Sequence, residues 1–488
     1  MKQNQTGSKA YLFSIVLVAV LGGLLFGYDT AVISGAEKGL QAFFLNAPDF
    51  RYTDFMHGFT SSSALIGCII GSSFSGFFAS RFGRKRSLIF AGICFFLSAW
   101  GSMNPESYVL PDGKPTMTLL IVFNFYRILG GIGVGMASAI CPMYIGEVAP
   151  SNIRGMLVSW NQFAIIFGQL VVYFVNFIIL GDHTNPMIES IGEGFSRVLP
   201  GSDPWTIATG WRYMFGSECI PAGLFTILIC FVPETPRYLV MIGQNDKALN
   251  ILSRINGTTQ AQTIINEIQN TISVKTEKLF SYGFMCIFVG IMLSVFQQAI
   301  GINAVLYYAP RIFQDMGMSN PMVQTVIMGV INITFTLVAV FTVERLGRKP
   351  LLISGSVGMA IGAFGVALTF GNPTLEVITM LSIMVYSACF MFSWGPICWV
   401  YIAEIFPNTI RGAAVAIAVA FQWIFNFIVS STFVPMFNMH LVPGDNFGHW
   451  FTYGLYGLIC IVSAIFVWRL VPETKGKTLE DMSKLWRK

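Results

Sequence analysis

Three ionisable side chains lie inside long apolar stretches of the sequence. Asp29 interrupts the otherwise uncharged run from Tyr11 to Gly35, Arg127 lies in "FYRILGGIGVG", and Glu218 lies in "SECIPAG". If these stretches cross a bilayer, an ionised carboxylate at the centre of a span costs about 3 kcal/mol, so it must take up a proton or pair with a cation. A movable contact between Asp29 and Arg127 would therefore switch proton affinity with conformation. A permanent structural ion pair is the alternative.

A second group of side chains suits a neutral ligand that carries many hydroxyl groups. Amides and aromatic rings match such a ligand, because hydroxyls both donate and accept hydrogen bonds while the carbon skeleton presents apolar faces. The candidates are Gln162 and Gln169 on one helix face, Gln297, Gln298 and Asn303 around a possible helix break at Gly301, Asn332, Trp399 after a helix break at Gly395–Pro396, and the adjacent Gln422 and Trp423. The alternative is that these amides hold membrane helices together.

The elements that carry these residues are predicted to be membrane-spanning helices. Of the 488 residues, 54% are hydrophobic and 11% are charged, and the mean hydropathy is +0.65. That is more apolar surface than a water-soluble domain could bury. Twelve apolar stretches of bilayer-spanning length recur between 12–36 and 449–471. We therefore predict an all-α integral membrane protein with twelve transmembrane helices.

Alternating loops differ in basic charge, which predicts the orientation in the membrane. Lys and Arg cluster in four segments: 81–86, 237–278, 345–349 and 475–488. The loops between them carry few basic residues, among them Lys38 and Arg311. Because short basic loops stay in the cytoplasm, both termini are expected there, in a plasma (inner) membrane. The net charge of +5 then reflects orientation and does not indicate nucleic-acid binding.

The chain repeats itself with a period of about half its length. "SRFGRKR" (80–86) matches "VERLGRK" (343–349), "IGEVAPSNIRG" (145–155) matches "IAEIFPNTIRG" (402–412), and "VPETPRY" (232–238) matches "VPETKGK" (471–477). Each pair relates one span to the sixth span after it, so two six-helix halves run in the same direction. We predict bundles at 1–232 and 281–475, cytoplasmic amphipathic linker helices at 233–280, and a cytoplasmic tail at 476–488.

With these motifs the sequence resembles the major facilitator superfamily, and within it the sugar porter family. The resemblance covers nearly all of the chain. It rests on the paired basic loops, on a Glu and an Arg seven residues apart in each half, on both PET motifs, on "QQAIGINAVLYY" (297–308) and on "GPICWVYIAEIFP" (395–407). It implies alternating access, with a substrate site between the halves near the middle of the membrane.

The same resemblance implies roles for individual residues. It implies that the amide and tryptophan side chains named above contact a sugar, and that Phe26 and Tyr307 line the same cavity. Proton-coupled members of the family carry Asp where this chain has Asp29, whereas the mammalian facilitative glucose carriers carry Asn. Asp29, Arg127 and Glu218 are therefore expected to couple sugar movement to a proton.

Charged residues at the cytoplasmic ends of the helices are expected to form a gate. Arg and Glu side chains on facing helices can pair between the bundles when that side is closed, and they must separate when it opens. An exposed pair contributes about 1 kcal/mol or less, which suits a reversible gate. The alternative for the basic residues is that they only enforce orientation. The expected gate residues are Arg81, Arg84, Glu147, Arg154, Glu234, Arg345, Arg348, Glu404, Arg411 and Glu473.

We therefore predict a secondary active transporter that imports a monosaccharide with a proton, and not an enzyme. D-xylose is the first candidate substrate and D-glucose or a related sugar the second, since the amides would satisfy either ring. A facilitative uniporter and a membrane sugar sensor are the alternatives. No cofactor or metal is expected: the nine cysteines include no CxxC pair, and "GGIGVG" inside an apolar helix suits close helix packing. The expected partners are the sugar, the proton and the lipid bilayer, without nucleic acid, and the protein is expected to work as a monomer.

Overall fold

Regular structure in the described part of the chain is helical throughout, as a bilayer requires of a chain that must satisfy its own backbone hydrogen bonds. The computed structural model describes residues 7–106, 114–150, 153–180, 204–272, 278–318, 320–407, 409–442, 446–475 and 486. The first half contains α1 (Lys9–Ala31), α2 (Ile33–Leu45), α3 (Asp54–Phe82), α4 (Arg84–Met103), α5 (Met117–Val148), α6 (Arg154–Ile179), a π-helical turn (Thr206–Gly210), α8 (Trp211–Ser217) and α9 (Cys219–Ile229).

Three linker helices follow, and the second half then repeats the plan of the first. The linker helices are α10 (Pro236–Met241), α11 (Asn245–Asn256) and α12 (Thr258–Ile272). The second half contains α13 (Phe284–Ala299), α14 (Ile302–Tyr307), α15 (Ala309–Asp315), α16 (Pro321–Leu346), α17 (Arg348–Thr369), the short 3₁₀ helix Pro373–Leu375, α18 (Glu376–Phe392), α19 (Trp394–Ile405), α20 (Arg411–Phe437) and α21 (Phe447–Leu470).

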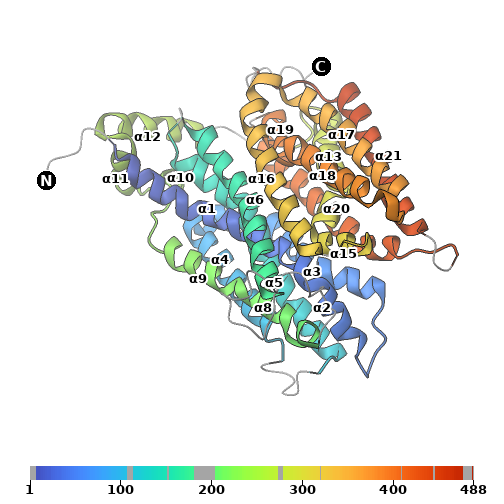
Figure 1. Ribbon diagram of the computed structural model, residues 1–488. Helices are drawn as coiled ribbons and strands as arrows, with labels where there is room; N and C mark the ends of the chain where they lie inside the picture. The colour runs from blue at the N-terminus through green and yellow to red at the C-terminus, as the bar shows by residue number, and fades with distance from the viewer. Residues whose placement is uncertain are drawn as a thin grey trace.

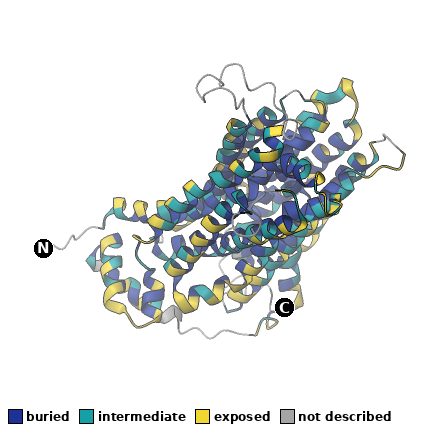
Figure 2. Ribbon diagram, turned by 90° about the horizontal axis from the view of Figure 1, so that it is seen from below, coloured by how far each residue is buried: buried dark blue, intermediate teal, exposed yellow. Residues whose placement is uncertain are grey.

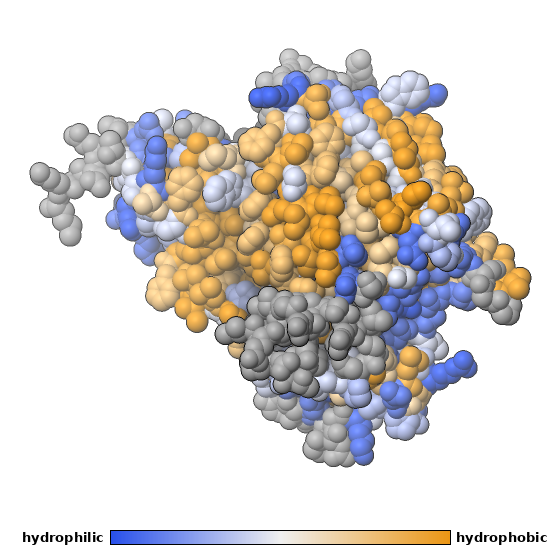
Figure 3. Space-filling model, in the orientation of Figure 1, coloured by the Kyte–Doolittle hydropathy of each residue, from blue (hydrophilic) through white to orange (hydrophobic). Residues whose placement is uncertain are grey.

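These helices account for the twelve predicted spans. Among the described residues, eleven helices or helix runs are long and apolar enough to cross a membrane. The sixth span is α8 followed by α9, each too short alone, with the junction at Glu218. The helices of the two halves lie side by side (Figure 1). Apolar side chains dominate the middle of the face shown in Figure 3, and exposed residues gather on the outside of the bundles in Figure 2, as expected for a protein surrounded by lipid.

Two ends of the structure can be distinguished. The linker end carries α10–α12, the α3–α4 and α16–α17 turns, the start of α20 and the end of α21. The opposite end carries the end of α2, the start of α3, α15 and the end of α20. Gly83 and Gly347 form the two equivalent turns at the linker end with φ of +92° and +91°, which only glycine adopts without strain. The predicted repeat is thus present in backbone conformation as well as in sequence.

Three spans that carry candidate site residues, the sixth, seventh and tenth, are broken along their length. The predicted break at Gly301 is confirmed, since Gly301 has φ +86° between α13 and α14. In the tenth span the helix breaks at Ser393, two residues before Gly395, and Pro396 lies in the first turn of α19. The cause is the same as predicted, because proline lacks the N–H that would continue the helix. Pro221 has the corresponding position after the break at Glu218.

Glycines allow α3 and α5 to pack with their backbones almost touching, as predicted for "GGIGVG". A Cβ atom on Gly131 would collide with the carbonyl oxygen of Ala64, and a Cβ on Gly67 or Gly71 would collide with the backbone of α5. Close packing such as that of α3 against α5 takes the place of the hydrophobic effect between helices in a membrane.

The linker helices have a small apolar core of their own, which includes Leu239, Leu252 and Ile265.

Replacing Gly71 by leucine should therefore destabilise the bundle, whereas the same change at Gly76 should not. Both lie on α3, but a Cβ on Gly71 meets the backbone of Ile132 and a Cβ on Gly76 meets nothing within 4 Å. Overpacking of this type costs about 1–3 kcal/mol. Thermal unfolding of the two purified variants in detergent measures the difference. Equal unfolding temperatures for Gly71→Leu, Gly76→Leu and the parent protein would contradict the packing described.

Candidate functional site

The three charges predicted inside the membrane meet in the first half. Asp29 of α1 and Arg127 of α5 are 0% and 2% exposed, and an Arg127 guanidinium nitrogen lies 2.6 Å from Asp29 Oδ1. The other terminal nitrogen of Arg127 donates to the Asp29 backbone oxygen at 3.2 Å, and the guanidinium lies 4.9 Å from the centre of the Phe215 ring. A buried charge is tolerated when it is paired in this way.

Glu218 adds a second carboxyl group beside this pair. It is 0% exposed at the α8–α9 junction, and it interacts electrostatically with both Asp29 and Arg127. Neither Glu218 oxygen, nor Asp29 Oδ2, accepts a hydrogen bond from a described residue. Two carboxyl groups thus share one arginine. Such a cluster can bind or release one proton, because one positive charge balances only one carboxylate.

Four of the predicted amides form one hydrogen-bonded chain in the second half. Asn303 Nδ2 donates to Gln298 Oε1 at 2.7 Å, and Gln298 Nε2 donates to Gln297 Oε1 at 3.0 Å. Gln422 also donates to Gln297 Oε1, and Gln297 Nε2 reaches the backbone oxygen of Trp394 at 3.3 Å. The helix breaks at Gly301 and Ser393 expose the backbone near this chain. It therefore joins α13, α14, α19 and α20 around one polar region.

Several polar atoms near the interface of the halves remain available to a ligand. The buried atoms Gln169 Oε1, Asn332 Nδ2, Gln422 Oε1 and Trp423 Nε1 make no hydrogen bond with a described residue. Buried polar groups without a partner are uncommon and costly in a folded protein. They form a mixed set of donors and acceptors, contributed by α6 of the first half and by α16 and α20 of the second.

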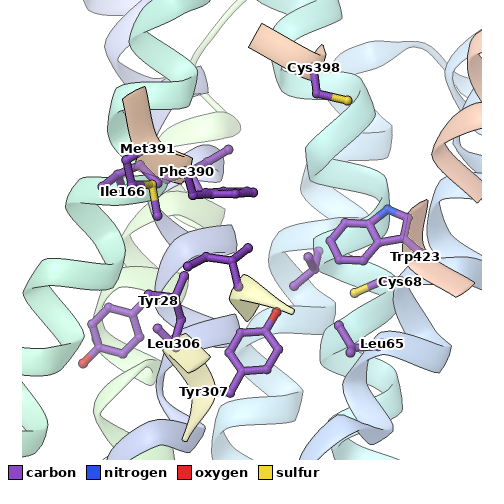
Figure 4. Packing of buried hydrophobic residues seen from close by; sticks show 14 of the residues in the cluster. Tyr28, Leu65, Cys68, Ile166, Leu306, Tyr307, Phe390, Met391, Cys398 and Trp423 are labelled. Atoms are coloured by element: carbon purple, nitrogen blue, oxygen red, sulfur yellow. The ribbon is translucent and has the colours of Figure 1, made fainter. Parts of the chain in front are cut away.

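Aromatic side chains from both halves border this region. The Phe26 and Trp423 ring centres are 5.6 Å apart, and Asn426 donates to the Tyr307 hydroxyl at 3.4 Å. Figure 4 shows Tyr307 and Trp423 of the second half beside Leu65 and Cys68 of the first. The rings therefore contact both bundles at the level of the helix breaks.

Other predicted residues lie outside the hydrogen-bonded chain. Gln162 and Trp399 are half-buried on α6 and α19. Asn332 accepts a hydrogen bond from Ser387 at 2.6 Å, so part of its amide joins α16 to α18. One tryptophan without a predicted role, Trp394, is completely buried, and its indole N–H donates to Ser356 at 2.7 Å.

A charge network joins the helices of the first half to one another at the linker end. Arg84 lies 2.7 Å from Glu147, whose second oxygen accepts from the Thr235 hydroxyl at 2.7 Å. Glu234 accepts backbone N–H groups of Arg84 and Lys85, both at 3.1 Å. The PET motif thus binds the turn between α3 and α4, and the acidic end of α5 binds both.

The second half repeats this network with equivalent residues. Arg348 lies 2.9 Å from Glu404, whose second oxygen accepts from Thr474 at 2.7 Å. Glu473 accepts the backbone N–H groups of Arg348 at 3.1 Å and Lys349 at 2.9 Å. The match extends to the threonine of each PET motif, which the sequence analysis did not single out.

The two PET carboxyl groups differ in their electrostatic balance. Burial raises the pKa of the Glu234 carboxyl above its usual value, against the opposing effect of nearby backbone N–H groups. Partial burial also opposes ionisation of Glu473, but the backbone N–H groups of Lys475, Lys349 and Arg348 outweigh it and lower its pKa. Glu473 is therefore firmly ionised near neutral pH, whereas Glu234 takes up a proton more readily.

Both ion pairs described at the linker end lie within one half, and neither joins the two bundles. Arg81, Arg154 and Arg345 are exposed, and Arg411 donates to the backbone oxygen of Phe406 at 3.3 Å. The gate expected from the sequence requires pairs between bundles when this end is closed. Arg84, Glu147, Arg348 and Glu404 thus pair within their own bundles in the part of the chain described.

Ion pairs do join the halves at the opposite end. Lys38 of α2 lies 3.1 Å from Asp315 of α15, and Glu37 lies 3.4 Å from Arg311. The sequence analysis placed Lys38 and Arg311 in loops, and this was wrong. Pro310 suggests the end of a helix, but it occupies the first turn of the short helix α15, where proline is favoured. Lys38 and Arg311 therefore lie on helices, where they hold the two halves together.

Comparison with known proteins defines the class to which this fold and site belong. Residues 15–486 match the family described as sugar (and other) transporter. The chain is 47% identical over 496 residues to the D-xylose-proton symporter of Escherichia coli (strain K12), covering 99% of this chain and 97% of that protein. It is 35% identical over 492 residues to the glucose facilitated diffusion protein of Zymomonas mobilis subsp. mobilis, covering 99% of both.

Solved structures agree with this assignment. The partially occluded inward open conformation of the xylose transporter XylE from E. coli matches with a TM-score of 0.82 at 45% identity, covering 96% of this chain and all of that chain. The proton:xylose symporter XylE bound to 6-bromo-6-deoxy-D-glucose matches with a TM-score of 0.78 at 46% identity, covering 98% of this chain and 99% of that chain. The protein is thus a multi-pass membrane transporter with the twelve-helix fold of the major facilitator superfamily. Within that superfamily it belongs to the sugar transporter family, whose members are transporters and not enzymes.

Proposed function

We propose that this protein imports a monosaccharide together with a proton, by alternating access. The observation that carries the proposal is the buried pair of Asp29 and Arg127, with Glu218 beside it, in the half that faces the amide chain of Gln297 and Gln422. A facilitator has no need for two carboxyl groups that share one arginine in the membrane. The 47% identity to a D-xylose-proton symporter supports the same conclusion.

The sugar is proposed to bind between the halves, where amides and aromatic rings meet. The atoms without partners on Gln169, Asn332, Gln422 and Trp423 supply donors and acceptors for hydroxyl groups. Gln162, Gln297, Gln298, Asn303 and Trp399 complete the proposed set, and Phe26 and Tyr307 provide the apolar faces. Binding at this site would satisfy buried polar atoms from both bundles at once.

Coupling of proton binding to sugar movement is proposed to depend on the ion pair between Arg127 and Asp29. With Asp29 ionised, the guanidinium is bound to it at 2.6 Å. A proton on Asp29 removes the charge that holds Arg127, and Glu218 then becomes the remaining carboxylate within its range. Arg127 belongs to α5, Asp29 to α1, and Glu218 to the junction of the sixth span. A shift of Arg127 between the carboxyl groups would therefore move three helices relative to one another.

The halves are proposed to move as two bodies, 1–232 and 281–475, joined by the linker 233–280. By the distribution of basic residues, the linker end and both termini face the cytoplasm, and the state described here is inward-facing. The repeated networks of Glu147, Glu234, Glu404 and Glu473 keep each bundle rigid at that end. In the outward-facing state Arg81, Arg154, Arg345 and Arg411 would contact the other bundle. A single chain contains the whole site, so a monomer suffices.

D-xylose is the proposed substrate, with D-glucose or a related sugar as the alternative. The relative with 47% identity is named for D-xylose, and an arabinose-proton symporter of Bacillus subtilis (strain 168) is 37% identical. Facilitated diffusion is the second candidate function. It is favoured by the glucose facilitated diffusion protein at 35% identity.

Removing one amide from the bonded chain should abolish sugar binding. Gln298→Ala deletes the group that joins Asn303 to Gln297, and Trp399→Ala removes an aromatic face. We expect each to weaken binding of D-xylose about fivefold or more, since a buried polar group left without its partner costs about 1–3 kcal/mol and a lost aromatic contact costs about 0.5–1.5 kcal/mol beyond the buried area. Trp394→Phe is the matched control, because Trp394 packs within the second half. Calorimetry on the purified variants that shows parental affinity for both alanine variants would remove these residues from the site.

Asp29→Asn should uncouple transport without abolishing sugar binding. Asparagine resembles protonated aspartate in shape but cannot release a proton, so sugar exchange between equally loaded sides should persist. Accumulation against a gradient should vanish, because a membrane potential supplies about 2.3 kcal/mol per 100 mV only when a charge moves with the sugar. Both activities are measured in the same proteoliposomes with an imposed pH gradient. Continued accumulation by Asp29→Asn would favour a permanent structural ion pair instead.

A further inference from the structure

A second buried charge cluster lies toward the opposite end of the protein, about two helical turns beyond Asp29 along α1 and α2. Glu37 of α2, His57 of α3 and Arg311 of α15 are 1%, 0% and 7% exposed. His57 Nε2 lies 2.9 Å from Glu37 Oε2, and an Arg311 nitrogen lies 3.4 Å from the same oxygen. Glu37 and His57 belong to the first half and Arg311 to the second. We call this cluster of three residues the Glu37 lock. Among the residues described at this end, it is the buried ionic contact between the two bundles.

The surrounding hydrogen bonds hold the lock in a defined geometry. The Tyr52 hydroxyl contacts His57 Nδ1 at 3.2 Å, so both ring nitrogens have partners. Arg311 also donates to Gln41 at 3.0 Å and to Asn438 at 3.4 Å. Asn438 in turn donates to Asp54 at 3.0 Å. The first half therefore supplies Glu37 and Gln41 as acceptors for Arg311, and these contacts depend on the position of α15.

We propose that the Glu37 lock holds the opposite end shut, and that a proton bound by His57 releases it. While His57 is neutral, Glu37 and His57 together carry one negative charge and attract Arg311 across the interface. When His57 is protonated, the same pair carries no net charge, because the imidazolium and Glu37 compensate each other within the first half. The net charge that attracts Arg311 to the Glu37–His57 pair then disappears, and Glu37 keeps a partner when Arg311 leaves.

The other charges at this end do not provide the same switch. The groups that face the lock are Lys38, Tyr52, Asp54, Tyr308, Asp315 and His449, the last of which also interacts with His440. Lys38 and Asp315 form the second pair between the halves, but their side chains are 17% and 32% exposed. Water screens such a pair, so it contributes little. Histidine is also the side chain whose charge ordinarily changes between pH 5 and 8.

This inference rests on the proposed alternating access for its consequence. If the opposite end faces outside, an acidic exterior opens the empty transporter toward the solution from which sugar is taken up. The Glu37 lock would thus act in the same direction as the proton-coupling site while being separate from it. A ligand can shift such an equilibrium only by its difference in affinity for the two states. Here that ligand is the proton, and the two states differ in whether the positive charge of Arg311 lies beside the Glu37–His57 pair.

The test is a distance measurement between the bundles at this end, without sugar and without a gradient. Nitroxide labels are placed on Leu45→Cys at the end of α2 and Val377→Cys at the start of α18, both exposed positions. The background carries Cys230→Ser, which removes the exposed native thiol. Pulsed electron paramagnetic resonance at pH 8 and pH 5.5 then reports the fractions of closed and open protein.

With the parental lock, we expect the open-to-closed ratio to rise about fivefold or more between pH 8 and pH 5.5. His57→Gln should stay closed at both values, because glutamine donates to Glu37 but does not charge. Arg311→Gln should raise the ratio about tenfold at both values. Lys38→Gln, the matched control on the neighbouring residue of α2, should behave like the parent.

The proposal is overturned if the parental distances are the same at both pH values, or if His57→Gln keeps the parental response to pH. It is also overturned if Arg311→Gln leaves the distances unchanged. Should Arg311→Gln fail to fold, the comparison of the parent with His57→Gln still shows whether His57 causes the response to pH. Because no transport is measured, failure here leaves proton-coupled import untouched, and failure of import would not alter these distances.

Discussion

A charge in the middle of a bilayer is costly, and the organisation of this protein follows from that constraint. An ionised side chain in a membrane helix must be paired, hydrated or neutralised. The chain places Asp29, Glu218 and Arg127 together where three helices meet. With two carboxyl groups and one guanidinium, the cluster has no single balanced state. Proton binding and helix position are therefore linked, and the helix breaks, the glycine contacts and the repeat provide the means by which the helices respond.

Structural roles and moving parts are divided between the two ends. At the linker end, Arg84–Glu147 and Arg348–Glu404 repeat one network within each half, each bound to a PET motif. Bonds inside a bundle stiffen it and do not oppose its movement against the other bundle. At the opposite end, Glu37–Arg311 and Lys38–Asp315 join the bundles. Among the residues described, the ion pairs between the halves thus lie at one end, which is what alternating access requires of one of its end states.

Much of this could be predicted from residue types and spacing. The spans follow from hydropathy, the breaks from Gly301 and Pro396, the close packing of α3 and α5 from "GGIGVG", and the two halves from the repeated motifs. The pairing within each half could not be predicted, because identical motifs in both halves fit pairs within a bundle as well as pairs between bundles. In the structure, Glu234 and Glu473 each bind the glycine turn of their own half. This position of the PET segments is what favours pairs within a bundle over pairs between bundles. The Glu37 lock was missed for a different reason. Glu37 and Arg311 are 274 residues apart, and no repeated motif or spacing relates them.

The central claim is that a proton enters with each sugar molecule because Asp29 must exchange its partner during the cycle. The most direct measurement is the pH of a weakly buffered solution outside proteoliposomes that contain the protein, after D-xylose is added with no gradient imposed. The account predicts that the outside becomes alkaline at a rate proportional to sugar entry, and that a protonophore abolishes the change. Sugar entry at the same rate with no change in external pH would contradict it and would identify the protein as a facilitator.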